Sequence, residues 1–247
     1  MIHKFFLLYY GDNLKIKENK KMKKNRLNIV ASGFFAILLS ISLASNVQAK
    51  EALKLGPAEI SFNAGYVSQY VWRGEDQNDS SGAASYGVDA ALPGDLYLGA
   101  WSSAASWATG INQELDVYAG FAPSFGDVSL DIGYVEYRYP GADANNFGEF
   151  YYGVSYAPKD KPYSFGIKYS DNDTNDTGLS ENIEYTASYD MFSIAYGDFD
   201  TSRTYTNVSV AKEYAGIEFA LTYTDVDWDA ASTARSNFTV LSLSKGF

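Results

Sequence analysis

The chain of 247 residues carries 19 Lys and Arg against 30 Asp and Glu, contains one His, and has no Cys. The missing Cys excludes a disulfide framework, a thiolate nucleophile and Cys-based metal sites. Residues 50–247 alone hold 11 basic and 28 acidic side chains, a net charge of −17, so nucleic-acid binding, which depends on Lys and Arg against phosphates, is not expected.

Residues 1–49 predict an export signal. A basic cluster over 20–26 is followed by an apolar stretch over 29–44 and by a small-residue sequence over 47–49. These are the three parts of a secretory signal peptide. The apolar stretch is shorter, and more diluted by Ser and Gly, than the roughly 20 apolar residues of a membrane-anchoring helix. We therefore expect an upstream extension and a signal peptide that is cleaved after Ala49.

The single histidine, His3, lies ahead of this cleavage point. The start codon stays open between Met1 and Met22, and Met22 is the more natural start, which would make residues 1–21 an upstream extension. In either case the exported chain contains no imidazole. That absence removes Ser-His-Asp hydrolysis, His-ligated zinc and most acid–base catalysis near neutral pH. We expect neither an enzyme nor a cofactor.

After a short expected tail over 50–58, apolar and polar residues alternate with a period of two, which indicates β-strands. In one clear case Phe219, Leu221 and Tyr223 alternate with Ala220 and Thr222. No segment repeats apolar residues at helical spacing. Twelve strands are predicted, over 59–73, 84–92, 95–103, 112–121, 127–138, 147–157, 162–170, 181–189, 191–198, 203–212, 216–226 and 235–247.

The connections between these strands alternate in character. Compact turns such as Pro93-Gly94 and Tyr214-Ala215 alternate along the chain with longer polar links such as 74–83 and 171–180. The link near Asp200 is short and breaks this alternation. An even number of strands, with short turns at one rim and long loops at the other, is typical of a transmembrane barrel. We therefore predict that residues 59–247 form an all-β, closed antiparallel up-and-down barrel with both termini at its periplasmic rim.

Alternation alone does not say whether the apolar face meets lipid or packs into a core. A soluble periplasmic β-barrel that binds a small apolar ligand is the alternative. The polar face, rich in Gly, Ser and Thr with scattered carboxylates, favours lipid on the other side. Aromatic residues near strand ends favour it too, because such rings collect at membrane interfaces: Tyr66, Tyr70, Trp72, Tyr134, Tyr137, Tyr139, Phe150 to Tyr152, Tyr223 and Trp228.

The chain ends on Phe247, in phase with Leu241 and Leu243. A terminal Phe that closes an amphipathic strand resembles the assembly signal read by the barrel-insertion machinery, although Lys245 stands where that signal has an apolar residue. The prediction is export through the periplasm to the cell outer membrane, with membrane lipid and lipopolysaccharide as partners. The sequence leaves the oligomeric state open.

Four motifs resemble, in order and spacing, the proteobacterial family of exported proteins labelled Gcw-chp. They are YVSQYVWRGEDQ (66–77), LYLGAWSSA (96–104), ELDVYAGF (114–121) and DIGYVEYRYPGA (131–142). The resemblance covers essentially the whole mature chain and implies an outer-membrane barrel of undefined function. It supplies no activity and no catalytic residues. Ala104 stands where the family usually has Asn.

The charged residues of the polar face are the main candidates for function. An acidic lumen would favour cations over anions, so one hypothesis is a narrow channel for small, cation-preferring solutes. The other is a structural surface protein whose lumen is filled by side chains or a loop, since barrels of this size have narrow interiors. The lumen-facing candidates are Asp89, Glu114, Asp116, Asp131, Glu149, Lys168, Glu184 and Glu218.

Three further patterns have weaker functional meaning. Glu114 and Asp116 have the spacing of a glycosidase acid pair, but no second signal accompanies them. The stretch DNDTNDTG over 171–178 is similar to a calcium loop, yet it lacks the Gly and the final Glu of that motif, so we expect no metal. Arg73 and Arg138 would either anchor lipid phosphates or pair with the nearby Glu75 and Glu136.

Overall fold

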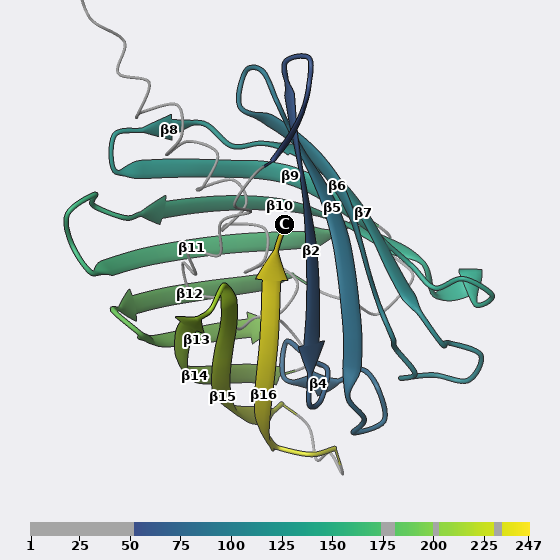
Figure 1. Ribbon diagram of the computed structural model, residues 1–247. Helices are drawn as coiled ribbons and strands as arrows, with labels where there is room; N and C mark the ends of the chain where they lie inside the picture. The colour runs from purple at the N-terminus through teal and green to yellow at the C-terminus, as the bar shows by residue number, and fades with distance from the viewer. Residues whose placement is uncertain (1–51, 174–180, 200–202, 230–233) are drawn as a thin grey trace, which may run out of the picture.

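The computed structural model describes residues 52–173, 181–199, 203–229 and 234–247, which form an antiparallel β-barrel (Figure 1). Among these residues no helix is long and apolar enough to cross a membrane. Twelve long strands build the wall: β2 (Ala58–Val67), β5 (Ala83–Leu92), β6 (Leu96–Ser103), β7 (Glu114–Phe121), β9 (Val128–Arg138), β10 (Phe147–Tyr156), β11 (Tyr163–Asn172), β12 (Asn182–Tyr189), β13 (Phe192–Phe199), β14 (Arg203–Tyr214), β15 (Ile217–Trp228) and β16 (Asn237–Gly246).

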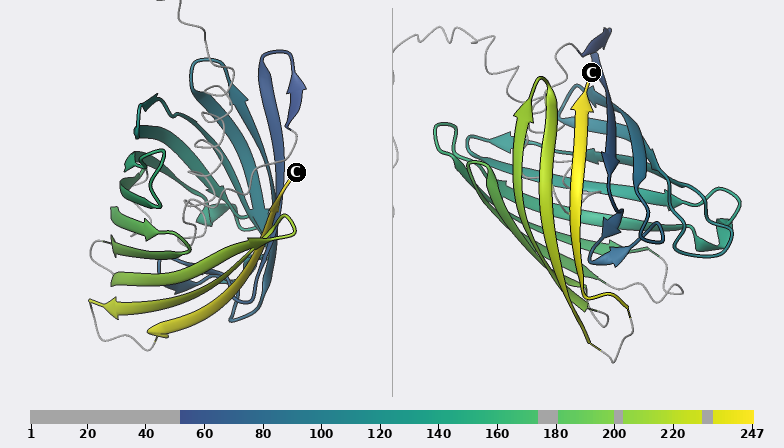
Figure 2. Two further views of the ribbon diagram at one scale, coloured as in Figure 1. Left: turned by 60° about the vertical axis from the view of Figure 1, so that its left-hand side comes forward. Right: turned by 60° about the horizontal axis from the view of Figure 1, so that its bottom comes forward.

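The wall closes because β2 pairs with β5 on one side and with the last strand, β16, on the other. Each wall strand runs antiparallel to both neighbours, and the views in Figure 2 show the sheet curling around its interior. Closure leaves no edge strand whose N–H and C=O groups would lack partners in hydrocarbon. The predicted fold, a closed antiparallel barrel of twelve strands, is confirmed.

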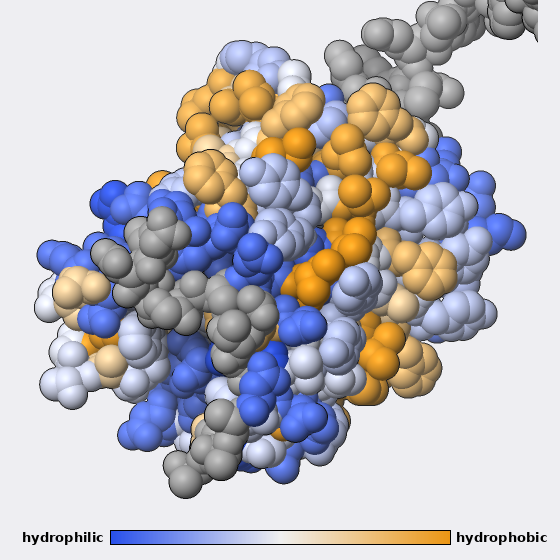
Figure 3. Space-filling view, turned by 180° about the vertical axis from the view of Figure 1, so that it is seen from behind, coloured by the Kyte–Doolittle hydropathy of each residue, from blue (hydrophilic) through white to orange (hydrophobic). Residues whose placement is uncertain are grey.

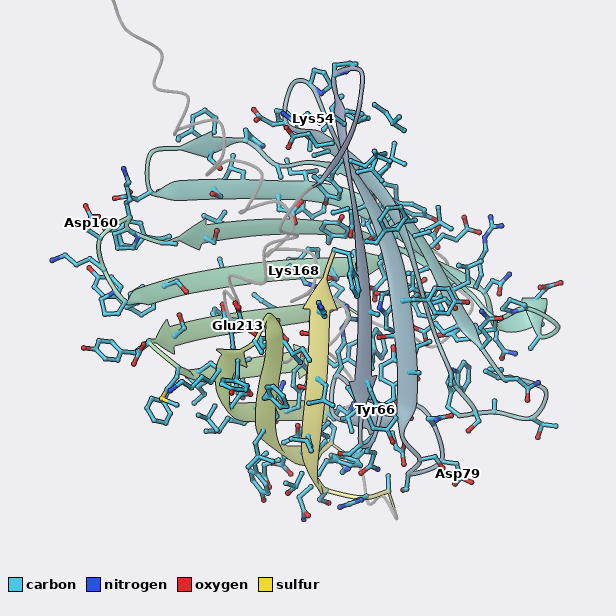
Figure 4. All side chains as sticks on the ribbon, viewed as in Figure 1. Lys54, Tyr66, Asp79, Asp160, Lys168 and Glu213 are labelled. Atoms are coloured by element: carbon cyan, nitrogen blue, oxygen red, sulfur yellow. The ribbon has the colours of Figure 1, made fainter. Side chains whose placement is uncertain are left out.

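The two rims differ in their connections. Tight turns join the strands at one rim. Between β14 and β15, Ala215 and Gly216 both have positive φ, 54° and 75°, as in the two-residue hairpin turns that match strand twist. A small strand, β8 (Ser124–Phe125), pairs with β9 at this rim. At the other rim, the long loop between β9 and β10 contains a 3-10 turn over Asp143–Asn145. Figure 4 marks the short-turn rim with Lys54, Asp160 and Glu213, and the long-loop rim with Asp79.

The two ends of the described barrel meet at the short-turn rim. Phe62 and Phe247 exchange two backbone hydrogen bonds, of 3.2 and 2.8 Å. Within the segment expected to be a tail, β1 (Leu53–Leu55) pairs with Ala58 to Ile60 at the start of β2. This hairpin continues the pairing of β2 past the end of β16.

The first predicted strand, 59–73, is wrong in its second half. Strand β2 ends at Val67, and the next residues form two short strands, β3 (Val71–Trp72) and β4 (Glu75–Asp76), which pair with each other. Arg73 and Gly74, with φ of 46° and 79°, make the turn between them. Positive φ at Arg73 is incompatible with a continuing strand. The chain therefore leaves the wall and turns into the barrel.

The apolar stripe of the wall strands faces outward. On β15 the side chains of Phe219, Leu221 and Tyr223 are exposed, whereas Ala220 and Thr222 are buried. An oblique apolar band crosses the outer face in Figure 3, and hydrophilic side chains gather to one side of it. A soluble barrel has the opposite arrangement, with apolar residues inside. An outward apolar face around a polar interior is the arrangement of a transmembrane barrel.

Candidate functional site

The interior is narrowed by the segment 68–82, here called the inward loop, which joins β2 to β5 and carries β3 and β4. Tyr70, Val71, Trp72 and Arg73 are all buried. The loop touches the wall on several sides, because Trp72 packs edge-on against Tyr137 of β9 at 5.9 Å and against Phe199 of β13 at 6.0 Å between ring centroids. The loop thus crosses the lumen.

Two arginines fix this loop. The guanidinium of Arg73 donates to both carboxylate oxygens of Glu149 on β10, at 2.6 and 2.8 Å. Arg203, at the start of β14, donates from Nε to the backbone oxygen of Arg73 at 2.7 Å and forms an ion pair with Glu75 at 2.9 Å. Burial lowers the pKa of Arg73, but the Glu149 carboxylate outweighs that effect and raises it. The hypothesis that Arg73 anchors lipid or pairs with Glu75 is therefore wrong.

Two candidate acids, Glu114 and Asp116, follow each other on the inner face of β7, and both are buried. The hydroxyl of Tyr70 donates to Glu114 at 2.9 Å. Burial, and then the carboxyl groups of Glu114 and Asp116, raise the pKa of Tyr70 and of Tyr139 well above the usual value. Both phenols therefore stay neutral donors. Both carboxyl oxygens of Asp116 are buried without a hydrogen-bond partner.

A hydrogen-bonded layer of tyrosines and acids lies on the inner face of the wall. Tyr97 on β6 donates to Asp131 at 2.7 Å and is also hydrogen-bonded to the hydroxyl of Tyr151. These rings lie over glycines on neighbouring strands, since Tyr97 is paired with Gly120 in the sheet register. A Cβ at Gly120 would meet the ring of Tyr97 within clashing distance. Glycine is required there so that the ring can lie flat across the wall.

The other candidates lie on the same inner face. Tyr118 donates to Asp89. Lys168, labelled midway along β11 in Figure 4, stands directly opposite Glu184 of β12, which accepts from Tyr205 at 2.9 Å. Glu218 is half-buried near the start of β15. The structure therefore brings Glu114, Asp116 and Glu149 near the inward loop and leaves Asp89, Asp131, Lys168, Glu184 and Glu218 further along the wall.

The expected interface aromatics divide into two groups. Tyr66, Tyr134, Phe150, Tyr152 and Tyr223 are outside or at the rim. The second group is Tyr70, Trp72, Tyr137, Tyr139 and Tyr151, which are buried in the interior, with Trp228, which is partly buried and packs against the interior cluster. Placing the second group in a membrane girdle was wrong, because they belong to the inward loop or to the inner phase of their strands. Sequence order alone did not separate the two phases near the strand ends.

Arg138 pairs with Glu136 at 2.8 Å and both are partly exposed, which confirms the ion-pair hypothesis for Arg138. Most of the acidic stretch 171–178, like Ala49 and the signal segment, lies outside the described residues. Asp173 is described, and it accepts hydrogen bonds from Tyr134 and from the backbone N–H of Gly148, at 2.6 and 3.0 Å. Within the described ranges no group of three His, Cys, Asp or Glu side chains is placed to hold a metal.

A cavity of about 380 Å³ lies at the long-loop rim, between the inward loop and two neighbouring loops. Trp72, Glu75 and Gln77 of the inward loop contribute to its walls. Trp107 and Tyr139, from the loops before β7 and after β9, meet edge-on at 5.2 Å. The sequence reasoning missed Trp107, Gln77 and Asn145 as cavity residues, because no periodic pattern marks loop residues that converge from different connections.

These features together define a closed β-barrel of the transmembrane class, with an apolar outer wall and a polar, constricted interior. Among solved structures, KdgM porin matches with a TM-score of 0.53 and 13% identity, over 76% of this chain and 99% of that one. NanC porin gives a TM-score of 0.43 at 13% identity, covering 76% and 97% of the two chains. OccAB2 of Acinetobacter baumannii gives 0.42 at 11% identity, covering 78% and 65%. The likeness to KdgM porin concerns the fold alone.

The sequence itself assigns the family. Residues 51–245 match the model of the family described as bacterial protein of unknown function (Gcw_chp). The chain belongs to this family. No curated protein sequence matches it.

Proposed function

We propose that the protein is exported to the outer membrane, with residues 1–49 removed, and acts there as a narrow, cation-preferring channel. The observation that carries the proposal is the charge of the interior. Acids dominate the inner face, and no salt bridge in the described part of the chain involves Glu114 or Asp116. An acidic, low-dielectric lumen attracts cations and repels anions.

The inward loop limits what passes. It is fixed to β10 through Arg73 and to β14 through Arg203, and the layer around Tyr97 and Tyr151 narrows the barrel below it. Small ions and small solutes are therefore the expected cargo. The partners of such a barrel are outer-membrane lipid, lipopolysaccharide at the long-loop rim and the insertion machinery that reads Phe247.

The same contacts favour a second candidate, a structural surface protein with a permanently closed interior. The bidentate bond between Arg73 and Glu149, with both side chains buried, is the specific observation behind it. Catalysis is not proposed in either case, since residues 50–247 contain no histidine. The alternative of a soluble barrel with an apolar ligand is disfavoured by the polar interior and the exposed apolar stripe.

Planar bilayers separate the two candidates. Purified protein in a KCl gradient should give small single-channel conductance with a reversal potential on the cation-selective side. A bilayer that stays silent after verified insertion would support the structural role and contradict the channel. Anion selectivity would contradict the electrostatic reasoning directly.

A further inference from the structure

The cavity at the long-loop rim has the walls of a binding site. Its volume of about 380 Å³ lies within the range of small-molecule sites, which are mostly apolar with a few converging polar groups. Trp72, Trp107 and Tyr139 supply aromatic surfaces, and Gln77 and Asn145 supply amides. The inward loop is joined to the loop before β7, since the backbone N–H of Ser106 donates to the backbone oxygen of Gln77 at 2.8 Å. The loop before β7 contacts the loop after β9 through the rings of Trp107 and Tyr139.

The charge around this cavity is not balanced. Glu75 is neutralised by Arg203, and Arg73, which stacks on Trp72 at 4.3 Å, is neutralised by Glu149. Glu114 lines the cavity and accepts a hydrogen bond from the phenol of Tyr70, and no salt bridge among the described residues includes it. Next to it on β7, Asp116 is fully buried with both oxygens unpartnered. Among the described residues that line the cavity there is no Lys or Arg.

We propose that this cavity binds an organic cation, a substituted ammonium group that rests against Trp107 and Tyr139, with Glu114 of the cavity wall as its counter-charge. Ammonium groups bind the faces of aromatic rings, and Trp is the strongest partner. A buried carboxylate without a cationic partner is costly, and a bound cation would offset the negative charge of Glu114. An anion would meet the carboxylate of Glu114 with no cationic side chain among the described lining residues. The site would be the entry point of the proposed channel.

The test uses the full mature chain, folded in detergent, with tetramethylammonium chloride as the probe. Two of its four tryptophans, Trp72 and Trp107, line the cavity, so binding should change the intrinsic fluorescence in a saturable way. NaCl at the same ionic strength should not reproduce that change. Heat-modifiable migration on gels verifies that each variant is folded.

Two variants probe the two parts of the site. Glu114→Gln should weaken tetramethylammonium binding by roughly tenfold or more, the loss expected for a charged buried contact. Trp107→Leu, on a partly exposed loop residue, should weaken it by roughly fivefold to tenfold, as for a lost cation–π contact. The control Glu213→Gln removes an exposed acid at the opposite rim and should leave the affinity unchanged.

A response that NaCl reproduces, or saturable binding of sucrose in place of tetramethylammonium, would overturn the proposal. Equal weakening by Glu213→Gln would overturn it as well. Only the passage of bound cations through the barrel rests on the proposed function, and bilayer recording tests that passage separately from binding. Binding with a silent bilayer would retain the site and reject the channel, whereas cation-selective conductance without binding would reject the site alone.

Discussion

Breaking the ion pair between Arg73 and Glu149 should release the inward loop. Their side chains are only 4% and 3% exposed, and removing one partner of a buried pair leaves an uncompensated charge at a cost of about 3–5 kcal/mol. Arg73→Ala also removes the stacking on Trp72, 4.3 Å away, which places the loss toward the upper end. A change of about 3 kcal/mol shifts the balance between the inward and released loop by roughly a factor of 100.

Single-channel recording measures this release. We expect Arg73→Ala to have a larger single-channel conductance than the unaltered protein. Its barrel should also unfold at a lower temperature, read as the temperature at which migration on gels changes. The control Arg138→Ala breaks an exposed pair with Glu136, worth about 0–1 kcal/mol, and should change neither. The double variant Arg73→Leu with Glu149→Leu should recover most of the stability, because no buried charge is left alone. Unchanged conductance in Arg73→Ala, or an equal effect in Arg138→Ala, would refute the reasoning.

Three other substitutions probe the wall and the lumen. Gly120→Ala places a Cβ 2.5 Å from the ring of Tyr97 and should lower the free energy of unfolding, measured in urea, by about 1–3 kcal/mol. Gly153→Ala, whose Cβ would have its nearest neighbour at 3.6 Å, is the matched control. Equal losses in the two variants would contradict the close packing of Tyr97 on Gly120. Leu221→Lys puts a charge on the outer face and should cost about 2–4 kcal/mol of barrel stability in lipid; no loss would argue against lipid contact. Asp116→Asn should reduce cation selectivity, read as reversal potential, without lowering stability; an unchanged potential would show that ions do not sense this residue.

The strand number and the two faces could be predicted because alternation is a local signal. Each strand such as 217–228 carries its own pattern, and the requirement to satisfy backbone groups in lipid dictates closure. The inner placement of Glu114 and Asp116 follows from the same phase. These parts of the fold need no knowledge of distant contacts.

The inward loop could not be predicted in this way. Alternation continues past Val67 through Tyr70 and Trp72, so the sequence reads as one long strand, and only the positive φ at Arg73 reveals the turn. The partner of Arg73, Glu149, is 76 positions away, whereas the sequence offers only lipid phosphates or the nearby Glu75 as its partner. The cavity is likewise built from three separate loops, whose convergence depends on the closed barrel.

The absence of Cys from the chain allows the most direct test of the central claim, that the apolar stripe meets lipid around a polar interior. Single Cys substitutions along β15 can be spin-labelled in lipid vesicles, and their collision rates with oxygen and with a water-soluble nickel complex can be compared. We predict high oxygen access at positions 219, 221 and 223 and low oxygen access at 220, 222 and 224. Access without a period of two, or with oxygen favouring the even positions, would contradict the claim.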